Sequence, residues 1–255
     1  MVGLGNIGSG IAEVLAGAGI QVVAVETDQA CLERGMTLLH TSTDRAVGRG
    51  KMTPEQRAAL VARIEPTLEH AKLAGCELVL ESISERLDAK RALFDELDRL
   101  CPPETIFATN TSSLSVTELA ALTKRPSRFV GIHFFNPAPV MGLVEVIQTV
   151  VTAPAVLRDV EALVERVGKI GVTVGDRAGF IANALLFPYL NSAIRMYEAR
   201  FASREDIDAA MRFGAGHPMG PLSLLDLIGL DTALLVLDTM YHQTRDHLHA
   251  PAPLL

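Results

Sequence analysis

The sequence predicts a mainly parallel α/β sheet domain followed by a smaller all-α domain. Up to about residue 175, short apolar runs of strand type alternate with helical segments, which is the pattern of a parallel sheet with crossover helices. Beyond that point the strand-like runs stop and the periodicity is helical, over residues 181–197, 203–213 and 230–247. We therefore expect one domain over residues 1–175 and a second over residues 176–255.

Each expected strand is a short apolar run. These runs are residues 22–25, 78–80, 106–108, 129–132, 144–147 and 172–174. Thr53 and Pro54 form a typical cap and first helical residue, and this helix should extend to about residue 63. Residues 87–100 should pack on the sheet, because one face of this helical segment carries Leu93, Phe94, Leu97 and Leu100.

The composition argues against several function classes. The net charge of −7 and the isoelectric point near 5.5 disfavour a nucleic-acid or anionic-membrane partner. Cys31, Cys76 and Cys101 lack metal-site spacing, so we expect reduced thiols and no metal. We see no leader peptide and no long uncharged apolar run. We expect a cytoplasmic protein with a small-molecule ligand.

A glycine-rich segment near the start of the chain predicts a nucleotide site. It reads Gly3-Leu4-Gly5-Asn6-Ile7-Gly8 and precedes a helical stretch at residues 9–18. Such glycines permit a tight turn, a close approach to pyrophosphate, and close packing of helix on strand. Glu26 ends the next strand, where an acid can take two ribose hydroxyls. We therefore expect a Rossmann-type dinucleotide-binding domain, although glycine-rich turns also occur without a ligand.

The segment from His133 to Glu145 predicts a proton-transfer pair. One strand-like run leads to His133, an Asn-Pro and Ala-Pro loop follows, and a second strand-like run contains Glu145. Two strands joined in this way can bring the imidazole and the carboxylate together, so that the carboxylate fixes the tautomer. The alternative is a core histidine and a surface glutamate that do not meet. A carboxylate buried in an apolar strand needs a partner, which favours pairing.

Together with further motifs in the same order, these segments resemble the L-3-hydroxyacyl-CoA dehydrogenase family, of the 3-hydroxybutyryl-CoA type. The resemblance covers nearly the whole sequence. Its motifs are G-L-G-N-I-G-S-G-I at 3–11, A-T-N-T-S-S-L at 108–114, H-F-F-N-P at 133–137, L-V-E-V-I at 143–147, A-G-F-I-A-N at 178–183, E-D-I-D at 205–208 and H-P-M-G-P at 217–221. Several motifs in one order are far more specific than any one of them.

The resemblance implies a reversible, NAD-dependent oxidation of (S)-3-hydroxyacyl-CoA to 3-ketoacyl-CoA in fatty-acid or short-chain acyl-CoA metabolism. It assigns catalysis to His133, Glu145, Ser112 and Asn183. It assigns cofactor binding to Gly3, Gly5, Asn6, Ile7, Gly8, Glu26, Glu85, Lys90, Asn110, Ser112 and Asn136. It also implies a homodimer through the helical domain, whose apolar residues at 187–197 and 224–228 exceed what so short a domain is expected to bury alone.

Several of these residues have simpler interpretations without the family. Ser112 would then be the cap of a helix that begins near Ser115, and Asn136 would only turn its loop. Glu85 and Lys90 would be a solvated acid and a solvated base at the start of a helix.

Ser42, Arg45, Arg49 and Lys51 form the one basic cluster of this acidic chain. The family uses this helical arm to contact the phosphates of coenzyme A, so we expect Ser42, Arg49 and Lys51 to bind the substrate. The alternative is that these residues only form a solvated charged surface, and we give the two interpretations equal weight. Gly48 and Gly50 weaken a continuous helix here.

Relative to the family, we expect a chain that is shortened at both ends. The strand before the glycine segment is nearly absent, and so is a basic and aromatic C-terminal segment with a lysine at the cofactor. Two alternatives to the CoA dehydrogenase stay open. One is a dehydrogenase of acyl-carrier-protein thioesters in a biosynthetic pathway, and the other is a truncated, inactive NAD-binding and association module.

Overall fold

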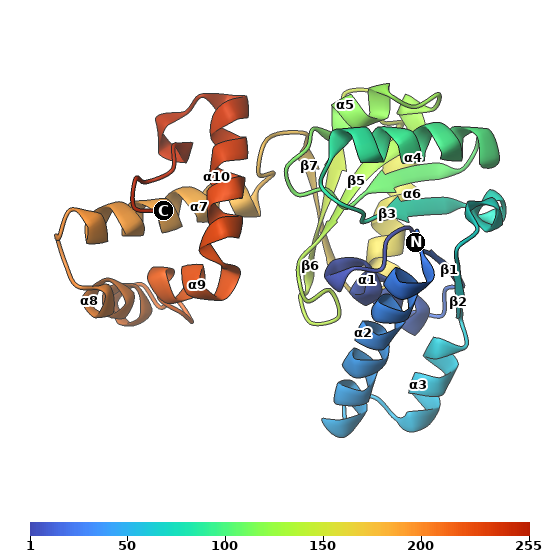
Figure 1. Ribbon diagram of the computed structural model, residues 1–255, viewed down its shortest axis with the longest axis horizontal. Coiled ribbons are helices and arrows are strands. Elements are labelled where there is room, and N and C mark those ends of the chain that lie inside the picture. The colour runs from blue at the N-terminus through green and yellow to red at the C-terminus, as the bar shows by residue number, and fades with distance from the viewer. The chain divides into compact units, whose positions relative to one another are not determined.

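Seven short strands form the sheet region of the first unit of the chain, Met1–Asp176 (Figure 1). The computed structural model describes residues 1–255, and the second unit, Arg177–Leu255, is helical. The strands are β1 (Val22–Val25), β2 (Ile64–Thr67), β3 (Leu78–Glu81), β4 (Ile106–Thr109), β5 (Phe129–Phe134), β6 (Leu143–Gln148) and β7 (Ile170–Gly175).

The strands pair in two groups that residue 2 connects. One group has the order β3-β4-β5-β6-β7, and the other is β1 beside β2. Val2 bridges them, because it pairs with Val25 on one side and Glu81 on the other. All neighbouring strands are parallel except β5 and β6, which are antiparallel. The predicted mainly parallel sheet is therefore confirmed.

Six α-helices surround the strands of this unit. They are α1 (Asn6–Gly17), α2 (Gln29–Gly48), α3 (Pro54–Val61), α4 (Leu87–Leu100), α5 (Val116–Ala121) and α6 (Pro154–Arg166), with 3₁₀ turns at His70–Gly75 and Pro126–Arg128. Local sequence explains several helix starts. Asp28 accepts a hydrogen bond from the Cys31 N–H at the start of α2, and Thr53 forms a reciprocal capping box with Gln56 at α3.

Helices cover both faces of the sheet. Successive strand residues point to opposite faces, so neighbouring residues of one strand contact different helices. Ala108 of β4 packs in a cluster with Ile11 of α1 and Val160 of α6. The preceding residue, Phe107, points the other way, and its ring centroid lies 5.7 Å from that of Phe94 in α4. Of the predicted apolar face of α4, Leu93, Phe94 and Leu97 are thus buried, and Leu100 is half-buried.

The second unit consists of short helices around a small core. They are α7 (Ala182–Glu198), α8 (Arg204–Ala209), α9 (Pro221–Ile228) and α10 (Leu230–Thr244), with a π-helical turn at Ala210–Gly214 and a 3₁₀ turn at His247–His249. Its buried cluster comprises Phe187, Leu190, Ile194, Leu225, Ala233, Val236, Leu237, Met240 and Ala252. The predicted all-α part of the fold is confirmed.

Some element boundaries differ from the prediction. The sequence predicts one helix over residues 203–213, whereas α8 ends at Ala209 and widens into the π-helical turn. Gly214 is the last residue of this turn and Gly216 lies two residues further on, and glycine is a poor helix former. Strand β2 was not predicted, because its central residues Glu65 and Pro66 are exposed and interrupt the apolar pattern.

Candidate active site

The glycine-rich segment at residues 3–8 packs too closely for side chains at two of its glycines. Gly3 has a φ of +85°, and a Cβ on it would lie 2.6 Å from the Ser82 carbonyl oxygen. A Cβ on Gly8 would lie 2.0 Å from the Gly3 carbonyl oxygen. Both glycines therefore let the loop approach β3 and α1 in the way that a dinucleotide-binding turn requires.

Open space and hydrogen-bonding groups lie beside this loop. A Cβ on Gly5 would meet nothing within 4 Å, and no side chain caps α1, whose first residues are Asn6 and Ile7. Amides at such a helix start can bind phosphate oxygens. The Glu26 carboxylate is held next to the loop, because its Oε1 accepts a hydrogen bond of 2.5 Å from the Leu4 N–H. The amides at the start of α1, which can bind a pyrophosphate, therefore lie near the Glu26 carboxylate, which can bind a ribose. These residues fit a dinucleotide.

Asn110 joins three strands at the carboxyl edge of the sheet. It follows β4, and its N–H donates to the Glu81 carbonyl oxygen over 2.9 Å. Its side-chain oxygen accepts from the Phe134 N–H at 2.8 Å, and its side-chain nitrogen donates to Ser82 Oγ at 3.4 Å. Parallel sheets bind ligands at this edge, so Asn110 stands where a cofactor contact is expected.

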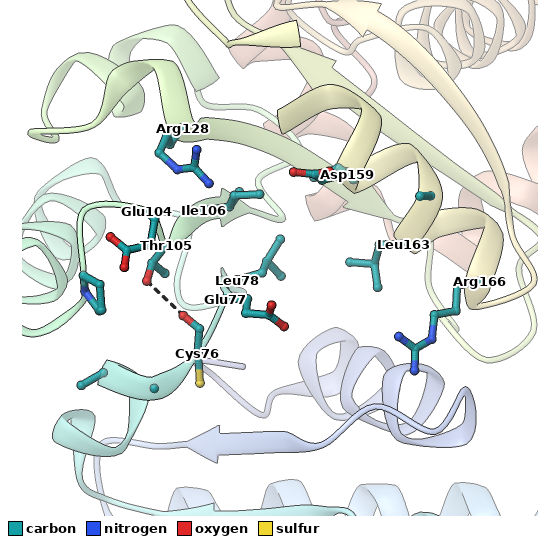
Figure 2. Close-up of a pocket in the computed structure, with 15 residues that line it drawn as sticks. Cys76, Glu77, Leu78, Glu104, Thr105, Ile106, Arg128, Asp159, Leu163 and Arg166 are labelled. Carbon is teal, nitrogen blue, oxygen red and sulfur yellow. Dashed lines mark hydrogen bonds between the residues drawn. The ribbon is translucent and has the colours of Figure 1, made fainter. Parts of the chain in front are cut away.

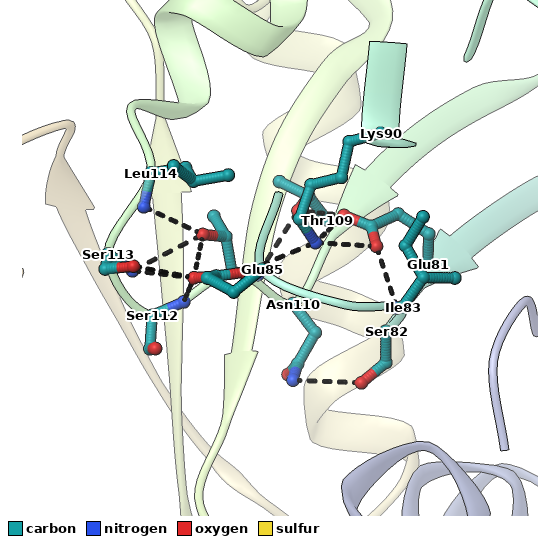
Figure 3. Close-up of polar contacts among 11 residues, drawn as sticks. Glu81, Ser82, Ile83, Glu85, Lys90, Thr109, Asn110, Ser112, Ser113 and Leu114 are labelled. Atoms are coloured by element: carbon teal, nitrogen blue, oxygen red, sulfur yellow. Dashed lines mark hydrogen bonds and ion pairs between the residues drawn. The ribbon is translucent and has the colours of Figure 1, made fainter. Parts of the chain in front are cut away.

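Glu85 holds the turn that follows β4 (Figure 3). Its Oε1 accepts hydrogen bonds from Thr111 Oγ1 at 2.6 Å, the Ser112 N–H at 2.9 Å, and the N–H and Oγ of Ser113 at 3.1 and 2.9 Å. Burial alone would raise the pKa of the Glu85 carboxyl. The charge of Lys90 and these hydrogen bonds outweigh burial and lower that pKa below its ordinary value. Glu85 is therefore an ionised group that fixes a turn, while 30% of its side chain stays exposed.

Ser112 lies in this turn, and its hydroxyl points away from Glu85 (Figure 3). The simpler interpretation of Ser112 as a helix cap does not match the geometry. Ser115 caps α5, because its Oγ accepts from the Glu118 N–H at 3.1 Å.

Lys90 is buried, contrary to its interpretation as a solvated base, with only 1% of its side chain exposed. Its Nζ lies 2.7 Å from Glu81 Oε1 and 3.4 Å from Glu85 Oε2. Glu81 was not among the predicted site residues. A signal existed, because this carboxylate ends an apolar strand and needs a partner when it is buried.

The structure brings His133 and Glu145 together. They face each other in the antiparallel register of β5 and β6, and His133 Nδ1 lies 2.8 Å from Glu145 Oε2. The two residues are 6% and 1% exposed, and the ring of Phe135 lies 4.6 Å from the imidazole, centroid to centroid. A buried carboxylate on Nδ1 orients the ring and can stabilise its positive charge.

The loop between β5 and β6 contains Asn136, which is exposed. Lys169 fastens the loop, because its Nζ donates to the carbonyl oxygens of Ala138 and Met141 at 2.8 and 2.7 Å. The same loop borders a cavity of about 710 Å³ that also takes in the basic cluster. Residues on its wall include Ser42, Arg45, Arg49, Lys51, Pro137, Pro139, Arg166 and Lys169.

Helix α2 ends at Gly48, within the basic cluster, and Gly50 has a φ of +68°. The expected break in the helix is therefore present. It leaves Arg49 as the first non-helical residue.

The remaining predicted site residue, Asn183, belongs to the second unit. It occupies the first turn of α7.

Comparison with known proteins agrees with this arrangement. Residues 1–177 match the family described as "3-hydroxyacyl-CoA dehydrogenase, NAD binding domain", and residues 179–255 match its "C-terminal domain". The chain belongs to the 3-hydroxyacyl-CoA dehydrogenase family. It is an NAD-binding oxidoreductase.

Similar proteins match this dehydrogenase over its full length. It is 44% identical to the 3-hydroxybutyryl-CoA dehydrogenase of Mycobacterium tuberculosis, over 100% of this chain and 90% of the relative. It is 41% identical to the mitochondrial hydroxyacyl-coenzyme A dehydrogenase of Homo sapiens, over 100% of this chain and 83% of that protein.

Solved structures agree. The crystal structure of (S)-3-hydroxybutyryl-CoA dehydrogenase PaaH1 from Ralstonia eutropha superposes with a TM-score of 0.96 at 40% identity, covering 99% of this chain and 89% of that one. No helix of the dehydrogenase is long and apolar enough to cross a membrane.

A second cavity of the dehydrogenase, of about 670 Å³, opens at the amino edge of the sheet (Figure 2). Leu78 and Ile106, which begin β3 and β4, line it together with Arg128, and Thr105 Oγ1 donates to the Cys76 carbonyl oxygen at 3.0 Å. None of the predicted site residues lines it. Because α/β sheets bind ligands at their carboxyl ends, we assign the chemistry to the opposite edge.

Proposed function

We propose that the dehydrogenase catalyses the reversible, NAD-dependent oxidation of (S)-3-hydroxyacyl-CoA to 3-ketoacyl-CoA. The observation that carries this proposal is the buried pair of His133 and Glu145, with 2.8 Å between nitrogen and oxygen. The pair stands beside the loop that borders the basic cavity. The printed names of the relatives support a short substrate, 3-hydroxybutyryl-CoA.

Proton transfer depends on the two ring nitrogens of His133. Because Nδ1 lies against the Glu145 carboxylate, the neutral ring carries its proton on Nδ1, and this N–H donates a hydrogen bond to Oε2. Nε2 then accepts the proton of the substrate 3-hydroxyl. The imidazolium that forms is stabilised by the buried carboxylate. Bound NAD⁺ supplies the acceptor for the hydride from the 3-carbon.

We assign to Ser112 and Asn183 the task of holding the substrate oxygens. Ser112 suits this task, because Glu85 fixes its backbone while the hydroxyl points away from Glu85 (Figure 3). The role of Asn183 rests on the family motif that ends at this residue.

The glycine loop and Glu26 are our proposed site for the pyrophosphate and the adenosine ribose. Glu85, Lys90, Asn110 and Asn136 are proposed around the nicotinamide ribose, and Lys90 acts there through Glu85 because its own side chain is buried. Ser42, Arg49 and Lys51 line the cavity proposed for the phosphates of coenzyme A.

NADH formation from (S)-3-hydroxybutyryl-CoA tests this proposal. We expect turnover by the wild-type chain and a large loss in His133→Gln, which controls for contaminating dehydrogenases. The same acyl group on acyl carrier protein is the second substrate of the experiment, and we expect it to react poorly. Turnover of the carrier-protein thioester alone would indicate the biosynthetic alternative. No turnover of either thioester would contradict the proposal.

We also propose that the protein is a cytoplasmic homodimer that associates through the second unit. Its three cysteines form no disulfide, which suits a reducing compartment.

Three leucines of the second unit are exposed and suit the dimer interface. Leu185, Leu227 and Leu235 are 72%, 71% and 61% exposed. Of the apolar residues expected at an interface, Phe187, Leu190, Ile194 and Leu225 lie instead in the core of their own unit. A dimer mass in light scattering at micromolar concentration is the expected result, and Leu235→Glu should lower that mass.

A further inference from the structure

Glu81 is a carboxylate at the centre of the carboxyl edge of the sheet, with 0% of its surface exposed (Figure 3). Lys90 Nζ donates to its Oε1 and Oε2 at 2.7 and 2.8 Å. Oε2 also accepts from the Ile83 N–H at 3.1 Å, and Thr109 Oγ1 donates to Oε1. A charge so completely removed from water persists only with such partners.

Lys90 links Glu81 to a second carboxylate, that of Glu85. Its Nζ lies 3.4 Å from Glu85 Oε2, so one ammonium group is shared by two acids. The other oxygen of Glu85 accepts the four hydrogen bonds of the turn that contains Ser112. The position of Lys90 therefore decides how strongly Glu85 is drawn away from the turn.

Glu81 also reaches the same turn by a second route. Thr109, its partner in the register of β3 and β4, accepts a hydrogen bond from the Thr111 N–H at 3.2 Å. The Glu81 carbonyl oxygen accepts from the Asn110 N–H at 2.9 Å. Both routes end on the segment that presents Ser112.

We propose that Glu81 is a positioning residue for the oxidation, a role that rests on the proposed function. It touches neither substrate nor cofactor. By holding the ammonium group of Lys90 at the end of β3, it keeps Glu85 on the turn and so sets the place of the Ser112 hydroxyl. With a neutral side chain at position 81, the attraction of Lys90 falls on Glu85 alone, and the carboxylate shifts from its four donors towards the ammonium.

The first experiment compares Glu81→Gln with the wild type for (S)-3-hydroxybutyryl-CoA oxidation. We expect kcat to fall by about 10- to 100-fold, the usual cost of a small misplacement of a reacting group. The KM for the thioester should change less, because the basic cavity and not the turn is proposed to bind its phosphates. The Tm should fall by on the order of 10 °C, because a buried lysine loses its charged partner.

Asp98→Asn is the matched control, because it removes the acid of another buried ion pair. Asp98 Oδ1 lies 2.8 Å from Arg125 Nε, and the two side chains are 2% and 7% exposed. This pair contacts the carbonyl oxygens of Cys101 and Pro102, away from the turn. We expect a lowered Tm with kcat unchanged. Both variants are assayed at a temperature where circular dichroism shows them folded.

A double-mutant cycle with Ser112→Ala separates positioning from simple destabilisation. If Glu81 acts through the turn, Glu81→Gln should cost less than about threefold in kcat once the Ser112 hydroxyl is gone. Thr109→Val, which weakens the same network without unpairing a charge, should show a smaller loss with the same non-additivity. It replaces Glu81→Gln in the cycle if that variant does not fold.

Two results would overturn the inference. One is an unchanged kcat in the folded Glu81→Gln and Thr109→Val variants of an active enzyme. The other is a loss that multiplies fully with that of Ser112→Ala. Inactivity of the wild-type chain would instead contradict the proposed function, so the two failures are distinguishable.

Discussion

Replacement of either member of the His133–Glu145 pair by glutamine removes one part of the proposed proton transfer. His133→Gln removes the base, and a positioned general base is usually worth about 10²–10⁴-fold in kcat. Glu145→Gln keeps an oxygen that can accept a hydrogen bond from the Nδ1–H, but it removes the negative charge. Glu145 is only 1% exposed. Neither change touches the glycine loop, so NADH should bind nearly as well as in the wild type.

The distance between the two groups sets the size of the Glu145 effect. With nitrogen and oxygen 2.8 Å apart, the charge centres of the carboxylate and an imidazolium are about 4 Å apart. Two such charges interact by about 4 kcal/mol at an effective dielectric constant of about 20. Because about 1.4 kcal/mol changes a rate tenfold, Glu145→Gln should lower kcat by about 10²–10³-fold.

The assay is steady-state NADH formation for the wild type, both single variants and the double variant. The double variant should be little worse than either single one, because groups that act as a unit are strongly non-additive. Full additivity of the two changes would refute the reasoning.

Three further predictions concern the cofactor, the substrate and the core. NAD should be strongly preferred over NADP, because a 2′-phosphate next to Glu26 would meet like charge, and Glu26→Ala should narrow the ratio of the two kcat/KM values. Arg49→Ala should raise the KM for an acyl-CoA severalfold, and the corresponding acyl-pantetheine, which lacks the nucleotide phosphates, should show no such change. Phe94→Ala should lower the free energy of unfolding by about 3–5 kcal/mol in urea titrations, since this ring is 0% exposed and a cavity would remain.

Local pattern was sufficient for much of the fold and for one part of the site. The strands at residues 22–25 and 106–108 and the buried face of α4 follow from apolar periodicity, which reports burial directly. The contact between His133 and Glu145 follows from two short strands and a proline-containing loop that joins them. These features depend on residues close together in the chain.

Features that depend on distant partners did not follow from the sequence. Lys90 resembles a solvated helix-start base until β3 is known to place Glu81 beside it. Likewise, Phe187 and Leu225 were expected at an interface, but the packing of α7 on α9 buries them in their own unit. Periodicity shows that a face is apolar, and only the tertiary structure shows what covers it.

The connection through Val2 has a consequence for how the first unit opens. Residues 1–3 exchange backbone hydrogen bonds with Leu80 and Ser82 on one side and with Val25 on the other, at 2.8 to 2.9 Å. Breaking these few hydrogen bonds would separate β1 and β2, with their helices, from β3–β7. We therefore expect the amides of these hydrogen bonds to exchange with deuterium before those at the centre of β5. A dinucleotide that contacts both Glu26 and Asn110 would hold the two groups of strands together. Its binding should slow exchange of the amides on both sides at once.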